Sequence, residues 1–176
     1  MRDRCQSNSA VDRTTPQGRA LTTLWLAVIR RYLIAVAAGH LVWEFIHLPL
    51  YTIWQTGNLG ALLFAATHCT GGDILIATAS LMLALIVFGQ DWPHDCHSFR
   101  RVAAASVLSG LSYTIFSEWL NTTVRKTWAY SELMPVIPGI ETGMSPVMQW
   151  LLIPLGGFWW ASRLLYSVRR LPVQVR

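Results

Sequence analysis

The stretch that decides the fold is Tyr32 to Trp54, which reads YLIAVAAGHLVWEFIHLPLYTIW. Apolar residues dominate it, and it is long enough for a helix that crosses a bilayer, which needs about 20 mainly apolar residues. Such a helix satisfies its own backbone amides in a solvent that contains no water. The stretch therefore predicts a first spanning helix at 32–54.

Three further stretches share this length and composition and predict spanning helices at 73–89, 102–121 and 146–165. The apolar run Leu59–His68 is too short to cross, which indicates a short re-entrant or interfacial helix between the first two spans. The fold class that we expect is therefore all-α: a polytopic membrane protein with four transmembrane helices.

Charge placement gives this topology a direction. The chain has 176 residues, of which 53% are hydrophobic and 13% charged, and its formal net charge is +5. All basic residues except Arg125 and Lys126 fall on the side of the two termini if the chain crosses four times. Because Lys and Arg beside spanning helices stay in the cytoplasm, we expect an inner (plasma) membrane protein with cytoplasmic N- and C-termini. Orientation and anionic lipid explain the positive charge, so no nucleic-acid partner is expected.

The same topology divides the chain into one membrane domain and two tails. Residues 1–20 are polar and basic and predict a disordered cytoplasmic tail, residues 21–170 form the transmembrane domain, and residues 171–176 form a second cytoplasmic tail. Tryptophan favours the headgroup level of a membrane. On this basis four tryptophans would mark the outer interface: Trp54, Trp119, Trp128 and Trp150.

Polar residues of the first span concentrate on one face. His40, Glu44 and His47 stand at i, i+4 and i+7, and Tyr51 extends the stripe at i+11. An ionisable group at the bilayer centre costs about 2.5 to 3.5 kcal/mol, so this stripe is not expected to face lipid. One interpretation is hydrogen bonding between helices as structural glue. The other is a polar cavity beside Trp43 that holds a ligand, a proton or a metal.

Candidate partners of the stripe lie at the outer ends of the next two spans. Asp73 opens the second span, where it either joins the stripe or favours the positive end of the helix dipole. Glu118 either reaches the surface or faces Glu44, and two neighbouring carboxylates would leave one acid and one base at neutral pH. The candidate substrate-binding residues are Trp43, Tyr51, Asp73 and Trp119.

The run His40-Leu-Val-Trp-Glu44-Phe resembles the His-x-x-x-Glu signature in a spanning helix of the emopamil-binding/EXPERA membrane proteins, which include sterol double-bond isomerases. Gly72-Asp73 and the run from Tyr113 to Glu118 are similar in order and placement to acidic positions of that family. The resemblance covers these short motifs and the four-helix outline. The family's Gly-Asp-x-Arg pattern is missing, because Ile-Leu follows Asp73.

What the resemblance implies is proton transfer across a double bond in a cavity between helices. His40, Glu44 and Glu118 would be the acid/base residues, and Trp43 would be a wall or a cation-stabilising ring.

Three functions remain open at this point. The first is an enzyme that performs acid/base chemistry on a lipid-soluble substrate, with four candidate catalytic residues: Glu44, His40, His47 and Glu118. The second is a metal- or proton-handling protein, with three candidate metal ligands: His47, His68 and Cys69. The third is a non-catalytic scaffold or accessory subunit.

The expected partners follow from these alternatives. They are membrane lipid, a lipophilic small molecule, and either further copies of this chain or another membrane protein. No cofactor is expected unless a metal ion binds.

Overall fold

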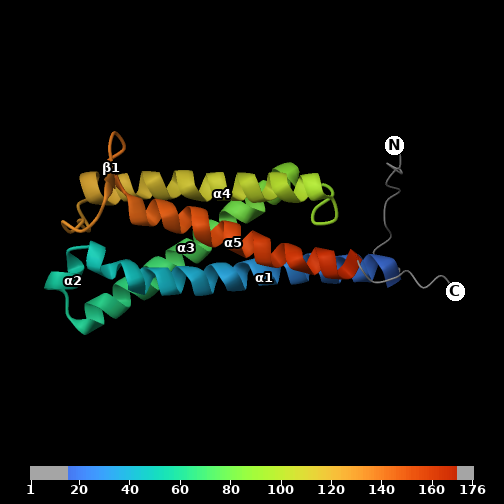
Figure 1. Ribbon diagram of the computed structural model, residues 1–176, viewed down its shortest axis with the longest axis horizontal. Helices are drawn as coiled ribbons and strands as arrows, with labels where there is room; N and C mark the ends of the chain where they lie inside the picture. Colours follow the sequence, from blue (N-terminus) through green and yellow to red (C-terminus); the bar gives the residue numbers. More distant parts are fainter. Residues whose placement is uncertain (1–15, 170–176) are drawn as a thin grey trace.

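The computed structural model describes residues 16–169 and the side chains of residues 23–165. Four long helices pack lengthwise as a bundle (Figure 1). α1 begins and α5 ends at one end of the bundle, called here the terminal end, and the connections 48–58 and 120–143 lie at the opposite end, called the loop end. The long helices are α1 (Pro16–His47), α3 (Leu59–Phe88), α4 (Cys96–Trp119) and α5 (Met144–Arg169).

α1 starts and ends earlier than the sequence predicts. It begins at Pro16, so residues 16–20 of the predicted disordered tail are helical, while residues 1–15 and the predicted tail 171–176 lie outside the described residues. It ends at His47 because Pro49 has no amide hydrogen to continue the helix. The chain then tightens into η1 (Leu48–Leu50) and makes one short turn, α2 (Ile53–Thr56).

The prediction of a separate short helix at residues 59–68 is wrong. This segment is the beginning of α3, which runs without a break to Phe88 over 30 residues. No proline separates the short apolar run from the next one, and Gly71 and Gly72 are tolerated inside a helix at about 1 kcal/mol each. The second long helix therefore begins at residue 59 instead of residue 73.

α4 and α5 form helices over the stretches predicted at 102–121 and 146–165, and α4 begins six residues earlier than predicted. Neither is among the described helices that are long and apolar enough to cross a membrane. The carboxylate of Asp95 caps α4, where it accepts the amide hydrogen of Ser98 at 2.6 Å. This hydrogen bond lowers the pKa of the exposed Asp95 carboxyl. α4 passes into the wider turn η2 (Leu120–Val124), and a small hairpin of β1 (Val136–Ile137) and β2 (Thr142–Gly143) leads into α5.

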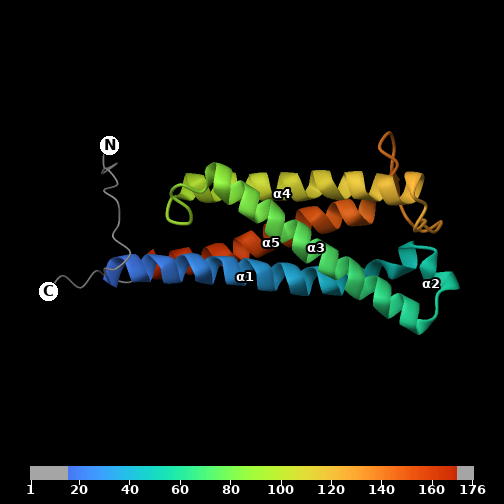
Figure 2. The same ribbon diagram turned by 180° about the vertical axis from the view of Figure 1, so that it is seen from behind.

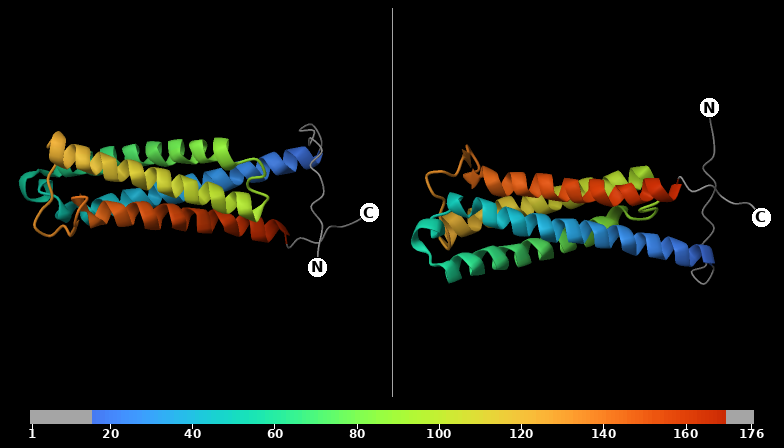
Figure 3. Two further views of the ribbon diagram at one scale, coloured as in Figure 1. Left: turned by 90° about the horizontal axis from the view of Figure 1, so that it is seen from above. Right: turned by 60° about the horizontal axis from the view of Figure 1, so that its bottom comes forward.

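The interior of the bundle changes character along its length. α3 crosses obliquely from beside the end of α1 to beside the beginning of α4 (Figures 2 and 3). Toward the terminal end the core is mainly apolar. The rings of Tyr32 and Phe158 pack with centroids 4.2 Å apart and planes tilted by 31°, and Phe99 meets Phe158 edge-on at 5.9 Å. Toward the loop end, buried positions carry polar side chains instead.

The outer surface is largely apolar. Two helical stretches, Thr23–Leu50 and Leu59–Phe88, are long and apolar enough to cross a membrane, with mean hydropathies of 1.6 and 2.1. Only 28% and 22% of their most apolar windows are buried inside the protein. Their exposed side chains include Leu75 and Ile86, which are 72% and 80% exposed. Soluble monomers rarely expose apolar surface on this scale.

Candidate functional site

Polar side chains that are buried or half-buried meet between α1, α3 and α5 toward the loop end. We call this group the polar cluster, and it comprises His40, Glu44, His47, Asp73, Ser145 and Gln149. α1 supplies half of it, because residues at i, i+4 and i+7 share a helix face. Its three members are almost fully buried, and the stripe faces the interior of the bundle.

The part of the cluster farthest from the loop end is formed by His40, Asp73 and Gln149. Nδ1 of His40 lies 3.0 Å from Oδ2 of Asp73. The amide nitrogen of Gln149 lies 2.9 Å from Nδ1 of His40, and it donates to Glu44 at 2.9 Å and to Asp73 at 3.1 Å. The indole N–H of Trp150 donates to Oδ1 of Asp73 at 3.2 Å. Both oxygens of the Asp73 carboxylate therefore accept hydrogen bonds.

The part nearer the loop end is formed around His47. Nε2 of His47 lies 3.0 Å from the second oxygen of Glu44, and Nδ1 lies 3.1 Å from the hydroxyl of Ser145. The indole N–H of Trp43 donates to the same hydroxyl at 3.1 Å. Ser145 stands just inside α5, which begins at Met144, and its hydroxyl joins the cluster.

Two carboxylates in this cluster are each paired with a histidine, Asp73 with His40 and Glu44 with His47. Such pairs, held in a desolvated interior, are typical of sites that transfer protons.

Glu118 lies close to this cluster and binds two phenols. It is 8% exposed, so it faces the interior and does not reach the surface. The hydroxyls of Tyr130 and Tyr51 donate to its carboxylate at 2.5 and 3.4 Å. Burial and the neighbouring Glu118 charge raise the pKa of Tyr130, so its phenol stays protonated and remains a donor. A T-shaped contact of Tyr51 with His47, with ring centroids 5.2 Å apart, links Glu118 to the polar cluster.

The long connection 125–143 covers the loop end over these residues. The amide of Thr52 donates to the carbonyl of Ala129 at 3.0 Å, and the amide of Ser131 donates to the carbonyl of Leu50 at 2.9 Å. Tyr130 stands between these two bonds, and its hydroxyl also accepts the amide hydrogen of Gly143 at 3.0 Å. The loop is therefore fastened to η1 and to α4, and Tyr130 also holds its last residue, Gly143, in place before α5.

Several predicted site residues lie elsewhere. Trp119 is 43% exposed and packs beside Phe116 on the outside of α4, so its role in substrate binding stays a prediction. His68 is exposed and stacks on Phe64. Cys69 is half-buried in α3.

The metal ligands predicted as His47, His68 and Cys69 do not come together. Within residues 23–165, no three His, Cys, Asp or Glu side chains are arranged to hold a metal ion. Residues 68 and 69 are part of α3, in which His68 is exposed, whereas His47 at the end of α1 is buried.

Two residues of the site were missed in the sequence. Gln149 was not considered, although an amide inside an apolar helix and four residues after Ser145 is the signal that would have found it. Trp150 was expected at the membrane interface but is 1% exposed. A Cβ at Gly110 of α4 would collide with its ring, so that glycine permits the close approach of α4.

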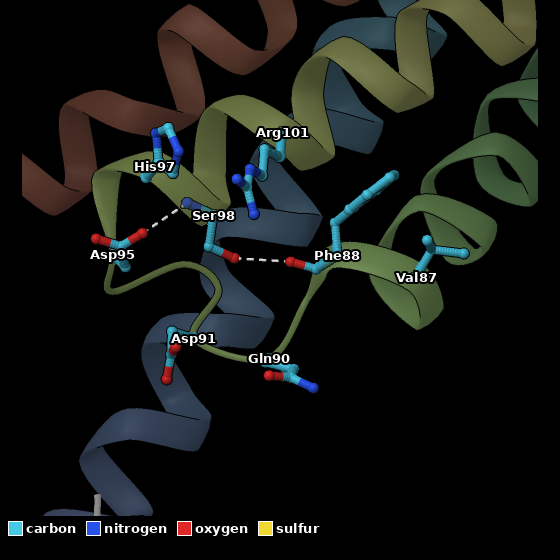
Figure 4. A pocket seen from close by; sticks show the side chains of 8 residues that line it. All are labelled: Val87, Phe88, Gln90, Asp91, Asp95, His97, Ser98 and Arg101. Atoms are coloured by element: carbon cyan, nitrogen blue, oxygen red, sulfur yellow. Dashed lines mark hydrogen bonds between the residues drawn. The ribbon is translucent and has the colours of Figure 1, made fainter. Parts of the chain in front are cut away.

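Figure 4 shows a pocket of about 280 Å³, which lies at the turn between α3 and α4, toward the terminal end of the bundle (Figure 1). It surrounds the turn between α3 and α4, and its polar groups include Asp95, His97 and Arg101. Local hydrogen bonds occupy part of it, because Asp95 caps α4 and the hydroxyl of Ser98 donates to the carbonyl of Phe88 at 2.8 Å. This pocket contributes no residue to the polar cluster.

The candidate site is thus a set of two histidine–carboxylate pairs bridged by Gln149, with Glu118 and its two tyrosines between it and the loop end. The resemblance suggested by His40 and Glu44 stays a prediction. In comparisons with protein-family models, curated proteins and solved structures, no match to this chain is found.

Proposed function

We propose that this chain is an integral protein of the cell inner membrane that crosses it four times, with both termini in the cytoplasm, and that it performs acid/base chemistry on a lipid-soluble substrate. The length of the helices supports the topology. The shortest of the four, α4, has 24 residues, which corresponds to about 36 Å at 1.5 Å per residue. The hydrocarbon core of a bilayer is about 30 Å thick.

The exposed surface and the charges support the same topology. α4 and α5 also expose large apolar side chains, among them Leu108 and Leu152. α1 begins and α5 ends at the same end of the bundle, as an even number of crossings requires. Arg31 and Arg163 lie over the rings of Trp160 and Trp159 near that end, a combination typical of the membrane–water interface.

One observation carries the proposed chemistry. Two histidine–carboxylate pairs lie in the interior, and in each pair the ring nitrogen is 3.0 Å from a carboxylate oxygen. The side-chain amide of Gln149 bridges the two pairs. A neutral histidine accepts a proton, and the adjacent carboxylate stabilises the imidazolium that forms. Structural glue would need only one hydrogen bond between helices. Two coupled pairs provide both a proton donor and a proton acceptor.

The apolar core explains why proton conduction across the membrane is the weaker alternative. The stripe ends at His40, and the next buried positions of α1 toward the terminal end are Val36, Tyr32 and Val28. The Tyr32 ring is stacked on Phe158. The described core positions of α1 beyond His40 are thus mainly apolar, which favours local chemistry at the cluster over a continuous proton relay.

Exchange of carbon-bound hydrogen tests this proposal without knowledge of the substrate. The purified chain is reconstituted with the lipid extract of its native membrane in heavy water, and deuterium that stays on carbon after return to ordinary water is measured by mass spectrometry. We expect one lipid-soluble component to gain deuterium. Glu44→Gln should lower the incorporation by on the order of 10²- to 10⁴-fold, the usual contribution of a general acid or base.

Glu132→Gln is the matched control, because Glu132 is an exposed carboxylate in the loop 125–143. It should incorporate deuterium at the wild-type rate. No incorporation above protein-free vesicles would refute the acid/base function and leave the scaffold as the better account.

A further inference from the structure

The hydrogen atoms available around His40 restrict its protonation state. The amide nitrogen of Gln149 has two hydrogens, but three acceptor atoms lie within 3.1 Å of it: Nδ1 of His40, Oε1 of Glu44 and Oδ2 of Asp73. Carboxylates only accept hydrogen bonds, so they take the two amide hydrogens. Nδ1 of His40 lies 3.0 Å from Asp73 and is satisfied if it carries its own hydrogen and donates it there.

The other ring nitrogen, Nε2, then carries no hydrogen. Nε2 of His40 is buried and has no hydrogen-bond partner among the described residues, and the whole residue is 0% exposed. A buried polar atom without a partner costs about 1 to 3 kcal/mol, so such atoms in folded proteins require an explanation. Nε2 is therefore a proton acceptor that no described residue contacts by a hydrogen bond.

Trp150 fixes the carboxylate that orients this ring. Its indole N–H can only donate, and it donates to Oδ1 of Asp73 at 3.2 Å. The Trp150 ring also lies beside the imidazole of His40, with centroids 5.0 Å apart. Since Gly110 admits Trp150 to this position, the orientation of His40 depends on α3, α4 and α5 together.

We propose that Asp73, Gln149 and Trp150 are positioning residues that hold His40 in its Nδ1–H form, so that Nε2 is the atom that accepts a proton from the substrate. This inference rests on the proposed function. When Nε2 takes a proton from a substrate C–H bond, the bonding electrons stay on the substrate and the imidazolium is paired with Asp73. Return of the proton to a different carbon restores the site, so no oxidant or reductant is needed.

The groups that act on His40 come from each neighbouring helix. α3 contributes Asp73, and α1 itself contributes Glu44 through Gln149. α5 contributes the uncharged donors Gln149 and Trp150. Glu118 of α4 is separated from His40 by His47 and Tyr51. Asp73 is therefore the one carboxylate in this set that contacts the His40 ring directly, and it is the residue to change.

Nitrogen NMR of the full-length chain, labelled with ¹⁵N-histidine in lipid nanodiscs, reports the ring protonation directly. The His40 signals are assigned by their loss in His40→Asn. In the wild type we expect a protonated Nδ1 and an unprotonated Nε2. In Asp73→Asn the new amide keeps its oxygen toward the donor-only indole of Trp150 and turns its NH₂ toward His40, so the ring proton should move to Nε2.

A second variant and a control keep the result interpretable. Asp73→Leu removes the acceptor and frees one Gln149 hydrogen for Nδ1, so it should move the proton in the same way. Glu44→Gln, which leaves Asp73 in place, should keep the wild-type form. A wild-type His40 that carries its proton on Nε2, or on both nitrogens, would overturn the proposal. So would an Nδ1–H form that survives in both Asp73 variants.

The two proposals fail separately. In the deuterium assay, loss of the correct ring form in Asp73→Asn should reduce incorporation by on the order of 10²- to 10⁴-fold. Deuterium incorporation by a wild type that carries its proton on Nε2 would refute the positioning of His40 alone. The Nδ1–H form without incorporation would refute the acid/base function, and with it the role of Nε2 as an acceptor for substrate.

Discussion

The hydroxyl of Tyr130 is a single group on which the closure of the loop 125–143 depends, and Tyr130→Phe removes it without changing the ring. The hydroxyl donates to Glu118 at 2.5 Å and accepts the amide hydrogen of Gly143 at 3.0 Å. The variant therefore loses two hydrogen bonds that tie α4 to the segment before α5. We expect the loop to open more often while the helical bundle stays folded.

The magnitude follows from the two bonds. The bond to Glu118 has the length of a charge-assisted hydrogen bond and contributes about 1.5 kcal/mol, the lower end of the range, because Tyr130 is only half-buried. Loss of the acceptor for the Gly143 amide adds about 1 kcal/mol. A total of about 2.5 kcal/mol corresponds to a roughly 50- to 100-fold rise in the opening equilibrium.

Amide hydrogen exchange in nanodiscs measures this opening. The amides of Ser131 and Met144, which donate to Leu50 and Pro135, should exchange faster by roughly the same 50- to 100-fold factor. Tyr51→Phe is the matched control, because its 3.4 Å contact with Glu118 is too long for a strong hydrogen bond. Exchange in Tyr130→Phe that stays within about twofold of the wild type would show that the phenol does not hold the loop.

Two further perturbations test other parts of the argument. Gly110→Ala should destabilise the protein by about 1 to 3 kcal/mol, because the new Cβ collides with Trp150. Gly156→Ala, where a Cβ meets open space, should instead be neutral or stabilising by up to about 1 kcal/mol. Thermal unfolding in mild detergent compares the two variants. Equal melting temperatures would contradict the packing argument. The raised pKa of Tyr130 means that the folded loop holds this proton more tightly than the unfolded loop. Its contribution is complete below the ordinary tyrosine pKa of about 10 and is lost as the pH rises above it. The loop amides should therefore exchange faster above that pH, beyond the intrinsic rise, in the wild type and not in Tyr130→Phe.

Local sequence patterns predicted the helices better than their ends. The i, i+4, i+7 spacing of His40, Glu44 and His47 placed them on one face, and they do face the interior. The predicted helix ends were less accurate, because the sequence pattern does not show whether a helix continues from one apolar run into the next. Residues 59–68 and the apolar run that follows them form one helix, α3. Because of Pro49, α1 ends at His47, seven residues before the predicted end of the first span at Trp54.

The partners of the stripe could not be predicted from such patterns. Asp73 contacts His40 and lies fourteen residues inside α3, which begins at Leu59, so the interpretation that it favours the start of a helix dipole is wrong. Trp119 and Trp150 looked alike in the sequence, yet one is exposed and the other is buried against Gly110. The difference is which face of each helix meets a neighbour.

By itself, the sequence determined that the chain forms long apolar helices and that one of them carries an ionisable stripe, because both properties repeat along a single helix. Only the tertiary structure decided that Asp73, Gln149 and Trp150 meet His40 and leave its Nε2 without a hydrogen-bond partner among the described residues. The contact between Gln149 and His40 joins residues 109 positions apart. These contacts depend on the angles at which α1, α3 and α5 cross, and these angles are set by the packing of all the side chains between the helices.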